Sequence, residues 1–343
     1  MAYTTVNKPT DHFNTKLYTG NGSSGHAITG VGFQPDWIWW KHRGSATYWH
    51  NLMDSVRGAS KQLYSNANNS EGTNTNGLES FDSDGFTVGS DNGANESGQN
   101  FVSWNWLASN TTASNTDGSI TSTVSANTTA GFSIVSWTGN GTSGATVGHG
   151  ISTPDVIIAK SRSGAHNWYV YHKSNGVGYG KLNLTDAFNS ATDVFTVAPT
   201  SSVFTISADT SINNSGDNFI AYCFAEKKGY SSFGTYQGNG SSSGSYIYLG
   251  FKPSFVMLKR TDTTQDWYMF DNKRDTINPM DIYLRANENG AEPSAFTFFD
   301  FLSNGFKCRN SASAVNASGG TYIYMAFAES PFVNSNGVPN NAR

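Results

Sequence analysis

The sequence predicts an all-β chain built from three tandem, antiparallel β-sandwich-like units, and three observations lead to this prediction. Only 13% of the 343 residues are charged, while 14% are aromatic and 36 residues are glycine, which suits short strands joined by tight turns. The chain also repeats itself three times. Finally, each repeat holds several short strand-like segments, and no long segment has a helical period.

Two sequence landmarks recur with one common spacing. Each unit has a Gly-Asn-Gly stretch, in "YTGNGSSG", "WTGNGTSG" and "YQGNGSSSG", followed by a proline in "GFQPDWIWWK", "ISTPDVIIAK" and "GFKPSFVMLK". Gly139 follows Gly20 by 119 positions, as Pro154 follows Pro35, so the landmarks shift together and indicate an internal triplication. The landmark residues, which we interpret as structural, are Gly20, Gly22, Pro35, Lys41, Gly139, Gly141, Pro154, Lys160, Gly238, Gly240, Pro253 and Lys259.

The limits of the units follow from a third set of similar segments. "NFVSWNWLA", "NFIAYCFAE" and "TYIYMAFAE" close the three units in turn. The polar stretch "SNTTASNTDGSITSTVSANTTAG" predicts a linker or a long surface loop after the first unit. We therefore expect an N-terminal arm at 1–12, β units at 13–110, 128–229 and 230–332, a linker at 111–127 and a C-terminal tail at 333–343.

Within each unit the candidate strands follow in one order. "DWIWWK" and "SFVMLK" are almost continuously apolar, which predicts central strands covered on both faces. "TYWHNLMD", "NWYVYH" and "DWYMFDNKR" come next, and "DGFTVG", "SVFTIS" and "NGFKCR" follow them. Asp84-Gly85 and Asn304-Gly305 are typical hairpin turns.

The Gly-Asn-Gly stretches are best interpreted as turns. A phosphate-binding loop is disfavoured, because no Lys-Ser/Thr follows the glycines and no helix is expected there. Glycine adopts the positive φ that tight turns need. We therefore expect three equivalent turns, with a ligand-contacting loop as the alternative.

One lysine recurs at the end of the central strand of every unit: Lys41, Lys160 and Lys259. We expect each stem to lie over apolar neighbours while its amine reaches water. Contact with an anion or a partner is the alternative.

Tryptophans are concentrated in two segments, "WIWWKHR" and "WNW". Strand alternation puts Trp37 and Trp39 on one face and Trp40 on the other. We expect one set to line the core, and the other to meet a second sheet, another subunit or a sugar ring. The candidate surface or partner contacts are Trp37, Trp39, Trp40, Trp104 and Trp106.

No residue pattern predicts catalysis, a cofactor or a metal centre. The carboxylates form no recognisable glycosidase pair, and the histidines show no zinc-binding spacing. Asp82, Asp84 and Asp91 crowd near glycines, which favours a hairpin over a surface calcium site. Cys223 lies in an apolar run and is interpreted as a core residue, with a bridge to Cys308 as the alternative.

Charge and hydropathy exclude two classes of partner. The net charge of -4 disfavours nucleic-acid binding. No apolar run is long enough to span a membrane. The first residues, "MAYTTVNKPTDHFN", lack the basic and apolar regions of a secretory signal.

Several blocks of the chain resemble a family of virion proteins from tailed phages of marine bacteria. They are "YTGNGS", "GFQPDWIWWK", "FLSNGFK", "NASGGTYIYMAFAE" and the terminal "NSNGVPNNAR". The resemblance covers nearly the whole chain and implies a structural, tail fibre-like protein without catalytic residues. It also implies a virion location after assembly in the host cytoplasm and release by lysis.

The leading hypothesis is therefore a non-enzymatic virion protein, a tail fibre or adhesin component that contacts the host surface. Its expected partners are other tail or capsid proteins, copies of itself, as in a trimer, and a host surface glycan. A capsid decoration or head-fibre protein is the first alternative. From another class, a carbohydrate-binding module or polysaccharide depolymerase is the second.

Overall fold

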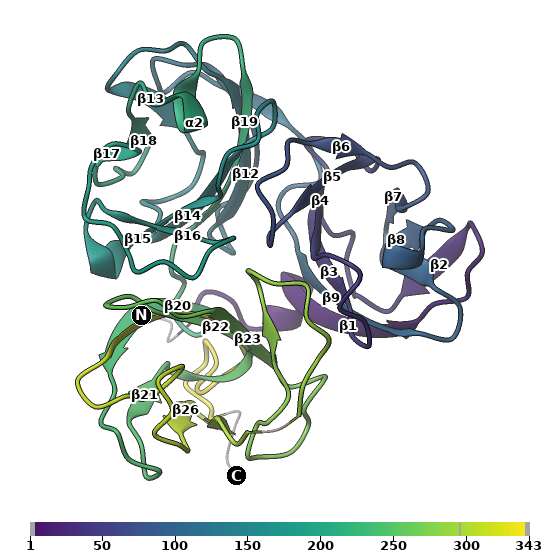
Figure 1. Cartoon of the computed structure of the whole chain (residues 1–343), viewed down its shortest axis with the longest axis vertical. Coiled ribbons are helices and arrows are strands. Elements are labelled where there is room, and N and C mark those ends of the chain that lie inside the picture. The colour runs from purple at the N-terminus through teal and green to yellow at the C-terminus, as the bar shows by residue number, and fades with distance from the viewer. Residues whose placement is uncertain (1–3, 295, 340–343) are drawn as a thin grey trace.

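In the part of the chain that the structure describes, six antiparallel sheets form three units around one centre, and each unit has a larger inner sheet and a three-stranded outer sheet (Figure 1). The computed structural model describes residues 4–294 and 296–339. Strands pair antiparallel throughout these sheets, so the prediction of an all-β, antiparallel fold is confirmed. The helical segments of the described residues are short: η1 (Pro9–Asp11), α1 (Asn92–Asn95), η2 (Lys173–Asn175) and α2 (Thr210–Asn213).

The first unit has the inner strand order β1-β9-β3-β4-β5-β6 and the outer order β2-β8-β7. Strands β7 and β8 form the hairpin expected at Asp84-Gly85. The strands are β1 (Phe13–Thr19), β2 (His26–Thr29), β3 (Trp37–His42), β4 (Asn51–Asp54), β5 (Lys61–Tyr64), β6 (Gly72–Thr73), β7 (Leu78–Asp82), β8 (Gly85–Val88) and β9 (Asn100–Trp106).

The second unit has the inner order β10-β11-β12-β19-β14-β15-β16 and the outer order β13-β18-β17. Its strands are β10 (Ala113–Asn115), β11 (Ser122–Asn127), β12 (Phe132–Thr138), β13 (Ala145–Gly148), β14 (Val156–Ser161), β15 (Tyr169–His172), β16 (Tyr179–Lys181), β17 (Phe195–Val197), β18 (Val203–Ile206) and β19 (Asn218–Phe224).

The polar stretch expected to be a linker or loop at 111–127 instead contributes two strands to the second unit. β10 pairs with β11, and β11 pairs with β12. Buried Ser122 and Val124 alternate with exposed Thr123, which is the period of a half-buried strand. The prediction was wrong because the polar residues of β10 and β11, the last two strands at one side of the sheet, resemble loop residues when only polarity is considered.

The third unit has the inner order β20-β27-β22-β23-β24 and the outer order β21-β26-β25. β25 and β26 form the hairpin expected at Asn304-Gly305. The strands are β20 (Ser231–Gln237), β21 (Tyr246–Tyr248), β22 (Phe251–Arg260), β23 (Trp267–Asp271), β24 (Leu284–Arg285), β25 (Phe299–Leu302), β26 (Gly305–Cys308) and β27 (Thr321–Pro331).

Each inner sheet is buried on both faces, because it separates a core of its own unit from a core shared by all three. In β3, Ile38 and Trp40 face the core of the first unit. Trp37 and Trp39 belong to the shared core, which we call the central core. β22 repeats this alternation, with Val256 in the core of its unit and Phe255 in the central core. The prediction that these strands are covered on both faces is confirmed.

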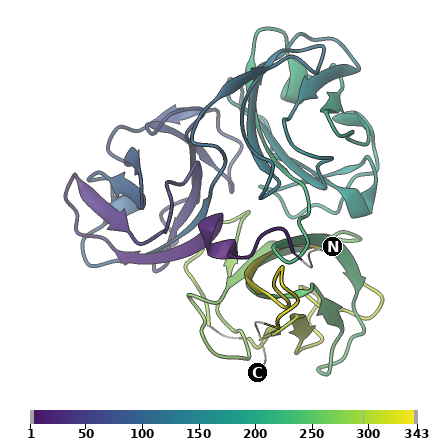
Figure 2. The same ribbon diagram turned by 180° about the vertical axis from the view of Figure 1, so that it is seen from behind.

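The N-terminal arm is packed against the body from its first described residue. The Thr4 hydroxyl donates to the Lys228 carbonyl oxygen at 2.8 Å, and Val6 is a member of the central core. Seen from behind, the arm crosses from the third unit to the first before β1 begins (Figure 2). In the same arm, η1 contacts β1 of the first unit and β27 of the third, so the arm ties the first and last units together.

Candidate functional site

The five tryptophans considered as surface contacts are interior residues. Trp37, Trp39 and Trp106 are each 1% exposed, and Trp104 is fully buried in the same central core. Trp40, also 1% exposed, packs in the core of the first unit. One set therefore lines the core of the first unit and the other meets the inner sheets of the neighbouring units, which is the second-sheet alternative. Another subunit or a sugar ring is not what covers these tryptophans, because both faces of the inner sheet are covered within the chain.

Aromatic rings join the three units through the central core. Trp37 of the first unit stacks on Tyr222 of the second, with ring centroids 4.2 Å apart. Trp106 meets Phe327 of the third unit at 5.6 Å, and Phe224 of the second also meets Phe327, at 5.9 Å. Such pairs stabilise beyond their buried area, so the units are held together much as the interior of a single domain is.

One backbone hydrogen bond recurs at every boundary between units. In each case an amide of a loop donates to a carbonyl just after the central strand of the neighbouring unit. The three bonds are Glu71 N to Arg162 O at 2.8 Å, Phe188 N to Thr261 O at 2.9 Å, and Glu292 N to Arg43 O at 2.7 Å.

Side chains at these positions form ion pairs at two of the three boundaries. Arg162 donates two hydrogen bonds to Glu71, at 2.8 and 3.0 Å. Arg43 binds Glu292 in the same bidentate way, through Nε to Oε2 at 3.0 Å and Nη2 to Oε1 at 2.7 Å. At the third boundary a phenylalanine replaces the acid, and the Phe188 ring packs 5.9 Å from Trp267.

Deeper in the boundaries, one residue at the end of β4, β15 or β23 reaches the next unit. Asp54 accepts from the Tyr222 hydroxyl at 2.8 Å, and Asp271 accepts from Trp104 Nε1 at 3.1 Å. His172 takes the equivalent place and contacts the Tyr324 carbonyl oxygen at 3.2 Å. Burial lowers the pKa of His172 to about 4, so the ring is neutral and donates to that carbonyl.

The three recurring lysines are buried, which corrects the expectation that their amines reach water. Lys41, Lys160 and Lys259 are 0% exposed. Each amine donates to two backbone carbonyls; for Lys259 these are Gln265 O at 2.5 Å and Thr185 O, from the second unit, at 2.9 Å. Burial lowers the pKa of Lys160 to about 7, and those of Lys41 and Lys259 to about 8. In each unit the central strand places the lysine on the face toward the central core, where backbone carbonyls take the place of water as hydrogen-bond acceptors.

The Gly-Asn-Gly stretches are turns, as predicted. In the first, Gly22 has a φ of 72°, and a side chain on Gly20 would collide with the backbone of Asn95 and Glu96. Asn95 is 0% exposed. Its Oδ1 accepts from Asn21 N at 2.8 Å, and its Nδ2 donates to Ser23 O at 2.8 Å.

The same asparagine clamp occurs in the other two units, through Asn213 and Asn316. These asparagines are not among the residues predicted from sequence, although the sequence carries a signal for them. Asn95, Asn213 and Asn316 each lie five positions before the first residue of the closing strand. The clamp therefore explains why one chain carries the turn three times.

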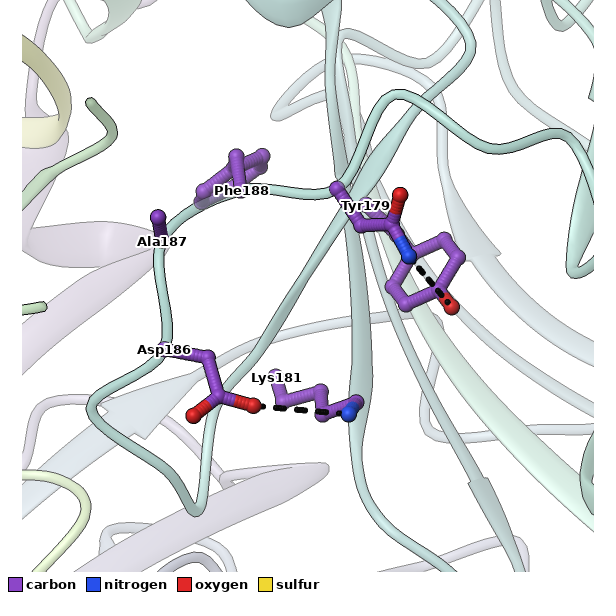
Figure 3. Close-up of a pocket in the computed structure, with 6 residues that line it drawn as sticks. Tyr179, Lys181, Asp186, Ala187 and Phe188 are labelled. Carbon is purple, nitrogen blue, oxygen red and sulfur yellow. Dashed lines mark hydrogen bonds and ion pairs between the residues drawn. The ribbon is translucent and has the colours of Figure 1, made fainter. Parts of the chain in front are cut away.

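A pocket of about 310 Å³ lies beside β16, near the boundary between the second and third units. Figure 3 shows that its polar side chains are paired with each other. Lys181 Nζ lies 3.4 Å from Asp186 Oδ2, and Asn189 Nδ2 donates to the Tyr179 hydroxyl at 3.2 Å. Burial and the nearby Asp193 raise the pKa of Tyr179 to about 12. The pocket is therefore a space between β16 and the loop at 186–189, and its polar side chains are already paired within the chain.

The remaining candidate residues have structural partners. Asp84 accepts from the amides of Gly30 and Gly32, and Asp91 caps α1 by accepting from Gly93 N. No group of three metal-ligating side chains was found among the described residues. Cys223 and Cys308 are both free and buried, so they do not form the disulfide considered as an alternative. Among the described residues, no helix is long and apolar enough to cross a membrane.

Comparison with known proteins gives one match. No curated protein and no solved structure matches the chain. A family model described as "Domain of unknown function (DUF7483)" matches residues 8–331, which includes all three units. The chain therefore belongs to this family of unknown function.

Proposed function

We propose that this chain is a non-enzymatic virion structural protein of a tailed phage, most directly a tail fibre or adhesin component that contacts the host surface. The observation that carries the proposal is the fusion of three β units through a buried central core. Ion pairs and backbone bonds at the boundaries reinforce it. A body of this kind suits a protein that bears load on a particle. The sequence resemblance to virion proteins points the same way.

Attachment to the particle would use an outer face of the units. The arm from Thr4 onward is packed against the body, so its described part is occupied. The outer sheets lie at the rim of the three-unit body (Figure 1) and are the surfaces farthest from the central core. Assembly into a homo-oligomer, such as a trimer, would bring several of these rims together.

A capsid decoration protein is the second candidate, and one observation favours it. The three units surround their centre with approximate threefold symmetry (Figure 1), and equivalent residues form the three boundaries. Such a body matches the threefold positions of an icosahedral shell, where one chain could occupy a site without breaking the local symmetry.

Immunogold electron microscopy of intact particles, with antibody against the purified chain, tests the proposal. Label on the tail is the expected result. Label spread over the head would overturn the fibre assignment in favour of decoration. Absence of the chain from purified particles by mass spectrometry would overturn both. A capsule-degradation assay with the purified chain tests the non-enzymatic part, and release of oligosaccharides would contradict it.

A further inference from the structure

The outer sheet of the third unit differs from its two counterparts in the residues that it exposes. Tyr246 and Tyr248, on β21, are 45% and 56% exposed. They flank buried Ile247 and therefore share the solvent face of the sheet. In the cross-strand register, Tyr246 lies opposite Lys307 and Tyr248 lies opposite Gly305. We call Tyr246, Tyr248 and Lys307 the tyrosine face.

The other two units show that the fold does not require these residues. Ile28 pairs with Phe86 in the first unit, as Ile247 pairs with Phe306 in the third. At the positions equivalent to the two tyrosines, the first unit carries Ala27 and Thr29, and the second carries Thr146 and Gly148. The position of Lys307 is Thr87 in the first unit and Thr205 in the second. The tyrosine face is therefore an addition to the repeat.

The geometry of the face suits a flat ligand. The Tyr246 hydroxyl donates to Asn304 Oδ1 at 2.7 Å, at the hairpin turn that precedes Gly305. The ring therefore extends along the sheet toward Gly305, which has no side chain to cover it. Alternate residues of a strand are about 7 Å apart, so the two tyrosines offer adjacent aromatic surfaces. The hydrogen bond fixes one ring before any ligand binds, which lowers the entropic cost of binding.

The charge beside the tyrosines indicates the sign of the ligand. Lys307 Nζ donates to the Ser243 hydroxyl at 3.3 Å and has no carboxylate in ion-pair distance among the described residues. The nearby Asp300 is already paired with Arg309. Asp300 lies opposite Lys307 across β25 and β26, so one carboxylate is set against two cations, Lys307 and Arg309. Among the described residues, this group therefore has a net positive charge beside the two aromatic rings.

We propose that the tyrosine face binds a polysaccharide that carries carboxylate or sulfate groups. The C–H faces of its sugar rings would pack on Tyr246 and Tyr248, as apolar surfaces pack on aromatic rings, and Lys307 would pair with an acidic substituent. This inference deepens the proposed function, because it names the surface and the ligand class of host contact. The inference rests on the proposed function only for its biological setting, since binding to the polysaccharide is argued from the tyrosine face itself.

Affinity electrophoresis of the purified full chain tests the proposal, in gels that contain a polyuronate, a sulfated galactan or a neutral glucan. We expect retardation in at least one acidic polymer and none in the glucan. Tyr246→Ala with Tyr248→Thr should weaken binding at least tenfold, and Lys307→Gln should weaken it several-fold while reducing its salt dependence. The first variant uses residue types that the first unit already carries, so its melting temperature should not change.

The matched control is Val197→Ser, which alters a 51% exposed side chain on β17 in the second unit. It should bind as the unaltered chain does. Equal binding by the double tyrosine variant, equal binding to the glucan, or no binding to either acidic polymer would overturn the proposal. Because the assay uses no particles, its failure is distinct from a failure of the virion assignment.

Discussion

The asparagine clamp predicts that one buried amide per unit holds the Gly-Asn-Gly turn in place. In the second unit, Asn213 Oδ1 accepts from Asn140 N at 2.9 Å. Its Nδ2 donates to Thr142 O at 2.9 Å and to Ser207 O at 3.0 Å. The substitution Asn213→Ala removes these three bonds, whose partners are backbone atoms, together with a longer fourth bond from Nδ2 to the exposed Asn140 Oδ1 at 3.2 Å.

The cost follows from which of these partners water can reach. Asn140 and Thr142 lie on the exposed loop, so rehydration limits each loss to the net value of a hydrogen bond, about 1 kcal/mol. Ser207 is 8% exposed, and its carbonyl would lose a partner without gaining water, at about 1–3 kcal/mol. We expect a total of about 3–5 kcal/mol. For a chain of this length that lowers Tm by about 1.4 °C per kcal/mol.

Differential scanning calorimetry of the purified chain measures the effect. A second variant separates the clamp from simple cavity formation. Asn213→Asp keeps the volume but turns a carboxylate oxygen toward two carbonyls, so at pH 7 it should be at least as destabilising as alanine, and acid should relieve it. Exposed Asn69→Ala is the control and should leave Tm unchanged. If alanine shifts Tm by less than about 1 °C, or if aspartate is harmless at pH 7, the clamp is refuted.

Three further predictions concern the centre and the boundaries. Burial lowers the pKa of Lys160 from 10.5 to about 7, so between pH 7 and pH 10.5 the unfolded chain binds more protons than the folded chain. The free energy of unfolding should therefore rise with pH across this window. Lys160→Met should flatten that rise, measured as the urea midpoint. Burial raises the pKa of Glu71, but hydrogen bonds from Arg162 and a second arginine lower it overall. The ion pair therefore stabilises the fold above about pH 4.5, and this stabilisation is lost as Glu71 is protonated in acid. Glu71→Gln should lower the free energy of unfolding by about 2–4 kcal/mol at pH 7 and by less at low pH, measured by urea unfolding. Trp106→Ala should lower the free energy of unfolding by about 3–5 kcal/mol and make all three units sensitive to limited proteolysis. Phe204→Ala, in the core of the second unit, should make mainly that unit sensitive. If the tryptophan variant were cleaved only in the first unit, the shared core would be contradicted.

Much of the fold could be predicted from sequence because strand patterns are local. Trp37 to Trp40 form a continuous apolar run, and such a run indicates a strand with both faces covered. The sequence could not indicate what covers the second face. Large apolar side chains would lie on that face whether a neighbouring unit, a separate subunit or a ligand covered it, so the tryptophans are candidate contacts on sequence alone. The structure places Trp37 and Trp39 in the central core and Trp40 in the core of the first unit.

The prediction for the recurring lysines was wrong for a related reason. Recurrence correctly indicated a structural role for Lys259, but a charged side chain at a strand end ordinarily reaches water. Its actual acceptors include a carbonyl 74 residues away, in another unit. That distance in sequence carries no local signal, whereas the asparagine clamp did carry one, at a constant offset from the closing strand.

Comparison among the three units separates what the fold requires from what it tolerates. The amide-to-carbonyl bond is present at all three boundaries, so it belongs to the architecture. The ion pair is present at two, and Phe188 against Trp267 replaces it at the third; a charged pair is therefore one solution among several. Positions that differ while remaining buried show how the core adapts. Positions that differ while exposed, as Tyr246 does, are free of that constraint, and function is best sought among them.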